Sequence, residues 1–209
     1  METKSKENKS KKTISTIKEE TVSKLNEKKS TFTTYSFKIT SENEIKEKLQ
    51  LVKKNHKDAS HFPYAVRITN VKNNSNKIII ETIERYSDDG EPNKTAGYPI
   101  FKLIQNQNLS NILIIVARTF GGIKLGPAGL MKAFSGAAQE AINKTSIETT
   151  EITLEKNIIT NINNLSKIEV FLKQQKINYE KKFESSKIKI KINIPLSKQK
   201  IISEIDRIK

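Results

Sequence analysis

The chain has 209 residues, no cysteine, and 38 Lys and Arg residues against 23 Asp and Glu, which gives a formal net charge of +15. This length allows one or two domains with a real core, although a hydrophobic content of 35% is lean. The lack of cysteine excludes disulfides and thiolate metal sites, and it is compatible with a reducing cytosol. No apolar run reaches the ~20 residues of a membrane-spanning helix, and the first residues lack the apolar core of a signal peptide. We therefore expect a cytoplasmic protein without a membrane partner.

The positive charge is spread along the whole sequence. Basic residues exceed acidic ones by 4 in residues 1–29, by 6 in residues 30–146 and by 5 in residues 147–209. Lysines outnumber arginines 34 to 4, and Asn and Ile are abundant, a pattern expected from an A/T-rich coding bias. Coding bias and function therefore both remain open as explanations of the charge. In either case the charge creates a field that attracts ribosomes and RNA.

The first part of the sequence predicts strands around one helix. Residues 1–12 have too few apolar groups to fold and are expected to form a disordered basic tail. An opening pair of edge strands is predicted at 13–19 and 22–30, followed by a strand at 32–39 with one buried face. Ser41 and Glu44 form a capping box for a helix over 42–55. Further strands are predicted at 61–68 and 77–85, on either side of the sequence VKNNSN, which is typical of a hairpin loop.

The segment from Ser87 to Ala141 contains the seven glycines of the chain and three of its five prolines. Glycine and proline impose special backbone geometry, so this is where the turns are most strictly specified. The segment predicts a helix over 97–107, a strand over 111–117 whose run ILIIV is buried on both faces, and a helix over 127–143. Pro127 suits the first turn of that last helix, and Gly126 is expected to cap it.

A second pattern follows Asn143, after which glycine is absent. Strands are predicted at 149–155, 177–184 and 187–194, a helix through Ile162 and Leu172, and a closing helix over 197–209. The sequence KIKIKINI alternates strictly, which indicates a sheet with one buried face and one wet, lysine-bearing face. The order βαββα is that of a ferredoxin-like domain without its final strand.

A glycine loop leaves the buried strand and runs into the following helix. Strand, glycine loop and helix N-terminus together suit an anion, because backbone N–H groups and the helix dipole converge there. The spacing GGxxxG matches neither the P-loop nor the dinucleotide-binding fingerprint. The residues expected to bind an anion or nucleic acid are Arg118, Gly121, Gly122, Lys124, Gly126 and Lys132.

An acidic turn made of Asp88, Asp89 and Glu91 has two interpretations. Clustered carboxylates bind hard divalent cations or act as a general base. On this interpretation these three residues and His61 are the catalytic candidates, and Asp88 and Asp89 are the metal candidates. The structural interpretation, which we favour, is that the aspartates make Asx-type turns and cap the helix after Gly97.

Arg118 is one of four arginines in a lysine-rich chain, which suggests a bidentate partner. That partner is either a phosphate or the carboxylates of Asp88 and Asp89. His61 lies at a strand start among apolar neighbours, so we favour a structural histidine over a catalytic one.

Two motifs in the glycine-containing segment resemble a known family. The first motif is DDGEP, followed by TAG and, one residue later, by Pro99. The second is RTFGGIKLG, followed by GLMKAFSGAAQEA. Together they look like the paired signature of the YigZ/Impact family of translation-linked proteins. The resemblance implies a two-layer βαβ N-terminal domain, as in domain IV of elongation factor G and a small-subunit ribosomal protein. It also implies a C-terminal domain similar to domain V of that factor. Four residues depart from the family's usual pattern. Thr31 and Tyr98 stand where Arg is usual, and Lys94 and Ala128 stand where Gly is usual.

We therefore expect an α+β protein with an Impact-type domain at 13–145 and a ferredoxin-like α/β sandwich at 146–209. Its expected function is regulation linked to translation, through binding of the ribosome, RNA or a translation-control protein, without a cofactor. The alternative is a metal-dependent enzyme that processes phosphoesters or nucleotides with Asp88, Asp89 and Glu91. The sequence leaves the oligomeric state open.

Overall fold

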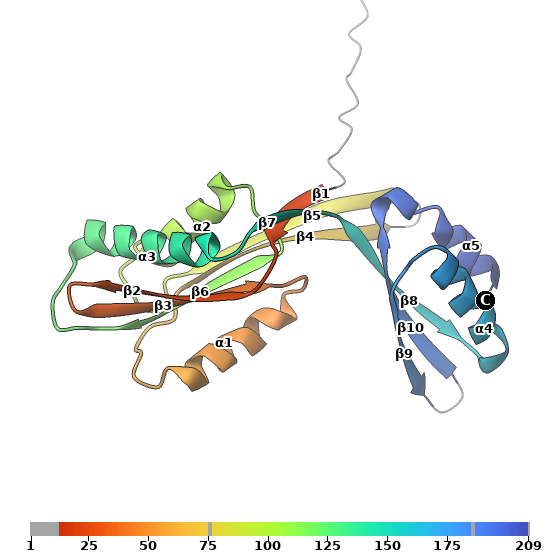
Figure 1. Cartoon of the computed structure of the whole chain (residues 1–209), viewed down its shortest axis with the longest axis horizontal. Helices are drawn as coiled ribbons and strands as arrows, with labels where there is room; N and C mark the ends of the chain where they lie inside the picture. The colour runs from red at the N-terminus through yellow and green to blue at the C-terminus, as the bar shows by residue number, and fades with distance from the viewer. Residues whose placement is uncertain (1–12, 75–76, 185–186, 209) are drawn as a thin grey trace, which may run out of the picture. The chain divides into compact units, whose positions relative to one another are not determined.

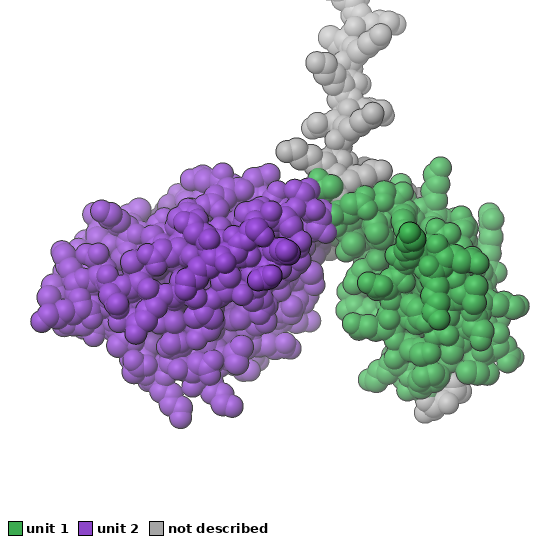
Figure 2. Space-filling model, viewed as in Figure 1, with its two compact units in different colours: residues 1–13, 71–79, 151–209 green, residues 14–70, 80–150 purple. Residues whose placement is uncertain are grey.

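The computed structural model describes residues 13–74, 77–184 and 187–208, with side chains described except at 72–74, 77 and 78. The predicted tail at 1–12 lies outside the described residues, as does part of the predicted hairpin loop. The chain divides into two compact units, one of residues 14–70 and 80–150 and the other of residues 1–13, 71–79 and 151–209 (Figure 2). The unit that contains the C-terminal residues thus also includes the segment 71–79.

The larger unit is built on a five-stranded sheet (Figure 1). Its central strand β6 pairs antiparallel with β3 on one side and with β4 on the other, so that Phe32 lies opposite Arg118, and Tyr64 opposite Ile115. The strands in spatial order are β2 (Thr21–Glu27), β3 (Ser30–Lys38), β6 (Ile112–Thr119), β4 (Tyr64–Asn74) and β5 (Lys77–Ser87).

Helices cover both faces of this sheet (Figure 1). One face of β6 packs in the cluster that contains Ile114 and Phe134, and the other packs in the cluster that contains Ile115 and Val52. The helices are α1 (Asn43–Asn55) on one face, and α2 (Gly97–Asn106) and α3 (Gly126–Asn143) on the other. The prediction that ILIIV is buried on both faces is confirmed. The expected two-layer arrangement is wrong, because a strand apolar on both faces needs helices on both sides.

The opening strands do not pair with each other. β1 (Thr13–Ile17) pairs with β7 (Ile147–Glu151) in a separate two-stranded sheet, whereas β2 pairs with β3. Backbone groups distant in sequence take up the hydrogen bonds of β1, since Ser110 donates its N–H to the carbonyl of Ser15 at 2.8 Å. This long-range pairing carries no local sequence signal.

The smaller unit contains a three-stranded antiparallel sheet whose spatial order is β8-β10-β9. Ile190 at its centre and Ile168 of α4 are fully buried in one apolar cluster. The elements are β8 (Thr153–Thr160), α4 (Ile162–Gln174), β9 (Tyr179–Glu184), β10 (Lys187–Pro195) and α5 (Ile201–Ile208). The predicted order βαββα is observed. The single strand predicted at 149–155 is two strands, β7 and β8, and the closing helix begins at Ile201 after a short 3₁₀ turn, Leu196–Lys198.

Candidate anion-binding site at the glycine loop

Arg118, near the end of β6, forms a buried ion pair. Its Nη1 donates to both carboxylate oxygens of Glu91, at 2.6 and 2.7 Å, and each residue is only 8% exposed. The guanidinium carbon also lies 5.6 Å from the ring centre of Phe32 and 5.5 Å from that of Phe120. The hypothesis that Arg118 pairs with Asp88 or Asp89 is therefore wrong, because Glu91 is the acid that the turn directs at it.

Asp88 caps α2. Its Oδ1 accepts hydrogen bonds from the backbone N–H groups of Ala96, at 3.1 Å, and Gly97, at 2.8 Å, and its Oδ2 accepts one from the N–H of Lys94 at 2.8 Å. These are N–H groups at the start of a helix, which would otherwise lack partners. The structural interpretation of Asp88 as the cap of this helix is confirmed.

Asp89 and His61 hold the acidic turn against the start of β4. Oδ2 of Asp89 accepts from the N–H of Phe62 at 2.7 Å, and Nδ1 of His61 lies 2.8 Å from the carbonyl oxygen of Asp89. The His61 ring also lies 2.9 Å from where a side chain on Gly90 would begin. The four catalytic candidates thus lie together but are bonded to protein groups. Among the described residues no group of three or more His, Cys, Asp or Glu side chains is placed to hold a metal ion.

The glycine loop begins in close contact with the β2–β3 turn. A Cβ on Gly121 would lie 2.0 Å from the backbone carbon and oxygen of Lys29, so only glycine fits there. The Gly121 N–H donates to Oγ of Ser30 at 3.2 Å. This contact brings the turn lysines Lys28 and Lys29, both exposed and both at positive φ, to the glycine loop. No sequence pattern indicates these two lysines, because the contact joins residues 91 positions apart in the chain.

The N-terminus of α3 is open to solvent. Its N-cap, Leu125, makes no side-chain hydrogen bond to the helix, and the first turn holds no acidic residue. Gly122 has φ +86°, and no atom lies within 4 Å of where its side chain or that of Gly126 would begin. The residues exposed here include Lys124, Pro127 and Ala128. Backbone N–H groups, the positive end of the helix dipole and lysines therefore converge on one accessible surface.

The structure places the predicted site residues in two groups. Gly122, Lys124 and Gly126 lie on the accessible surface, and Lys132 is exposed further along α3. Arg118 lies inside, where it supports the loop, although its buried Nε has no hydrogen-bond partner among the described residues. Apolar side chains also flank the loop, because Phe120, Ile123 and Met131 are each 41–52% exposed. We refer to residues 120–128 together with Lys28 and Lys29 as the loop site.

The lysine-bearing face of the C-terminal sheet is largely paired. Lys189 forms an ion pair with Glu184 at 2.9 Å, and Lys191 forms one with Glu155 at 3.0 Å. The hydrogen bond from Lys189 lowers the pKa of Glu184 below its usual value. This face therefore carries less free positive charge than the sequence KIKIKINI indicates.

Residues 28–142, more than half of the chain, match the family model of the Impact N-terminal domain. The chain belongs to the IMPACT family. The match includes both the acidic turn and the glycine loop, so these two features lie within the part of the chain shared with this family.

Curated IMPACT-family relatives align with parts of the chain. IMPACT family member YvyE of Bacillus subtilis is 33% identical over 134 residues, which cover 63% of this chain and 57% of the relative. IMPACT family member YigZ of Escherichia coli is 34% identical over 89 residues, 43% of this chain and 44% of the relative. The aligned part of the chain thus spans about half the length of these relatives.

A solved structure described as that of a hypothetical protein shares the fold, with a TM-score of 0.65 and 24% identity over 90% of this chain and 87% of its own. No helix in the part of the chain that the structure describes is long and apolar enough to cross a membrane.

The structure explains one of the departures from the IMPACT pattern. Lys94, where Gly is usual, has φ +61°, a conformation that favours glycine. The chain tolerates it because the N–H of Lys94 donates to Asp88 at 2.8 Å. Ala128, another departure, lies exposed in the first turn of α3. Neither change closes the loop site.

Proposed function

We propose that this IMPACT-family protein is a cytosolic regulatory protein linked to translation, which binds a negatively charged partner through the loop site. The partner is the ribosome, RNA or a protein of translation control. The translational setting comes from the resemblance to the YigZ/Impact family, and we infer with it that the C-terminal unit is a ferredoxin-like domain without its final strand. The observation that carries the binding function is the accessible N-terminus of α3, which has no side-chain cap and no acidic residue in its first turn.

A binding function suits the geometry better than catalysis. The loop site offers donors and positive charge, which recognise phosphates without reacting with them. The acidic residues required by the enzyme hypothesis are instead used as a helix cap, as an acceptor for Phe62 and as the partner of Arg118. A cleft in which they act on a substrate would require these bonds to break.

The test is co-sedimentation with ribosomes and with purified ribosomal RNA over a salt series. Wild type is compared with Lys28→Glu/Lys124→Glu, which reverses two exposed lysines of the loop site. The control is Lys189→Glu/Lys191→Glu, which changes the net charge by the same amount in the C-terminal sheet. We expect the loop variant to lose association near physiological salt and the control to keep it. Equal loss in both variants would reduce the interaction to general charge, and the proposal would be abandoned.

A further inference from the structure

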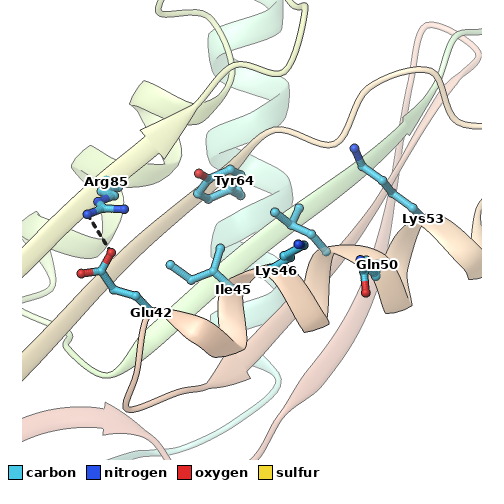
Figure 3. A pocket seen from close by; sticks show the side chains of 8 residues that line it. Glu42, Ile45, Lys46, Gln50, Lys53, Tyr64 and Arg85 are labelled. Carbon is cyan, nitrogen blue, oxygen red and sulfur yellow. Dashed lines mark ion pairs between the residues drawn. The ribbon is translucent and has the colours of Figure 1, made fainter.

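A recess lies on the face of the five-stranded sheet that α1 covers, whereas α2 and α3 cover the opposite face (Figures 1 and 3). The recess has a volume of about 390 Å³ and lies between α1 and the strands β4 and β5. One stripe of α1 lines it at helical spacing, with Ile45 and Leu49 followed by Lys53. We call it the α1 groove.

The floor of the groove is apolar and its rim is positively charged. Ile45 is buried, and the half-buried Leu49 and Tyr64 pack on the same core cluster. The rim carries Lys46 and Lys53, both exposed, and neither forms an ion pair within the described part of the chain. The ends of such side chains stay in water while their stems line apolar surface.

An ion pair closes one end of the groove. Oε2 of Glu42 lies 2.7 Å from Nη2 of Arg85, whose side chain is 59% exposed (Figure 3). Together with the two lysines, the lining therefore holds three cations against a single carboxylate. The groove thus has an excess of positive charge around an apolar floor.

We propose that the α1 groove binds a short acidic peptide of a partner protein, with one bulky aliphatic side chain on the floor. The acidic side chains would meet Lys46 and Lys53, and the aliphatic group would cover Leu49 and Tyr64. The stretch from Glu42 to Lys53 is about 16 Å long at 1.5 Å per helical residue. An extended peptide of about five residues has that length.

A peptide fits this groove better than a nucleic acid. Single-stranded nucleic acids bind where aromatic rings offer flat faces for the bases, whereas the floor here is two aliphatic side chains and one tyrosine. The carboxylate of Glu42 also opposes a phosphate backbone, which is charged at every nucleotide, whereas a peptide can direct its carboxylates toward Lys46 and Lys53 and away from Glu42. This inference does not rest on the function proposed for the loop site, since the two sites share no residue.

The test is an NMR titration of the isotopically labelled full chain with the blocked peptide Asp-Glu-Leu-Glu-Asp. We expect the amide resonances of residues 42–53 and of Tyr64 to shift. The variant Lys46→Glu/Lys53→Glu should weaken binding about tenfold, because two attractive charges become repulsive. The control Lys54→Glu/Lys57→Glu reverses two exposed lysines outside the groove and should change affinity less than about twofold. Both variants alter exposed residues, and their spectra report whether they fold.

Three outcomes would overturn the proposal. The first is the absence of shifts in the groove at millimolar peptide. The second is shifts confined to residues 120–128, which would assign the peptide to the loop site. The third is that a short oligouridylate shifts the groove resonances and loses its binding in the Lys46→Glu/Lys53→Glu variant, which would make the groove a nucleic-acid surface. None of these outcomes alters the co-sedimentation test of the loop site.

Discussion

At the scale of single residues, burial decides what an arginine does. Arg118 and Arg85 each pair with a glutamate, at 2.6 and 2.7 Å. The Arg118 side chain is 9% exposed and that of Arg85 is 59% exposed. Similar distances therefore have different energetic consequences, because a charge left unpaired in the interior cannot be solvated.

We predict that Arg118→Ala lowers the free energy of unfolding by about 3–5 kcal/mol, because it leaves Glu91 buried without its partner. Arg85→Ala is the matched control and should cost less than about 1 kcal/mol, since its pair is exposed. Urea unfolding followed by circular dichroism measures both. An Arg118→Ala protein of wild-type stability that no longer binds ribosomes would instead assign this arginine directly to a ligand.

At the scale of elements, the two long helices of the glycine-containing segment begin differently. α2 is capped by the side chain of Asp88, whereas α3 begins at Leu125 without a side-chain cap. An uncapped, exposed helix start is less stable than a capped one, but it leaves N–H groups available to a ligand. If the loop site binds the ligand proposed for it, binding at this position competes with local stability.

We predict that Ala128→Glu separates stability from binding. A carboxylate in the first turn of α3 interacts favourably with the helix dipole, so stability should stay equal or rise by about 0.3–1 kcal/mol. Association with ribosomes or RNA should fall, because the same charge repels phosphate. Ala128→Gln, which adds similar volume without charge, is the control. Unchanged co-sedimentation of Ala128→Glu would show that ligands do not approach this helix end.

A second element-scale prediction concerns pH and the packing of β9 on α4. Hydrogen bonds from Lys181, at 2.7 Å, and from Tyr179, at 2.9 Å, lower the pKa of Glu169 below its ordinary value of 4.5. A lowered pKa stabilises the fold above about pH 4.5, and this contribution is lost as the pH falls toward the folded-state value. The urea concentration at the midpoint of unfolding should therefore fall less steeply with decreasing pH in Glu169→Gln than in wild type. A variant with the same decline as wild type would exclude Glu169 as a source.

At the scale of the whole molecule, the lysines that contribute to the net charge of +15 differ in how free they are to contact a partner. Lys189 and Lys191 of the C-terminal sheet are paired with glutamates, while the lysines of the loop site lie beside an open helix end. General attraction and local recognition should therefore depend differently on salt.

We predict that the apparent association constant of wild type for ribosomal RNA falls linearly with salt on logarithmic axes. Removing two phosphate contacts by Lys28→Glu/Lys124→Glu should reduce the magnitude of the slope by about two, since each contact releases about one counterion. The Lys189→Glu/Lys191→Glu control should reduce it by clearly less. Equal slopes for the two variants would contradict a localised site.

Most helices and strands, and the local turn chemistry, could be predicted from the sequence. Three features each depend on residues close together in the chain: the buried run ILIIV, the alternation of KIKIKINI and the helix cap by Asp88. Their patterns can therefore be recognised in the sequence. The contacts between groups distant in the chain could not be predicted, because they depend on how the whole fold packs. Glu91 rather than Asp88 or Asp89 pairs with Arg118, and β1 pairs with β7.

The loop site shows the same division. Its glycines and Lys124 follow one another in sequence and could be predicted, whereas Lys28 and Lys29 reach it only because Gly121 packs on their turn. The α1 groove had no sequence signal at all, since its lining comes from a helix and two strands placed together by the sheet. Contacts between residues far apart in the chain depend on the packing of the whole core, so a local sequence pattern cannot predict them.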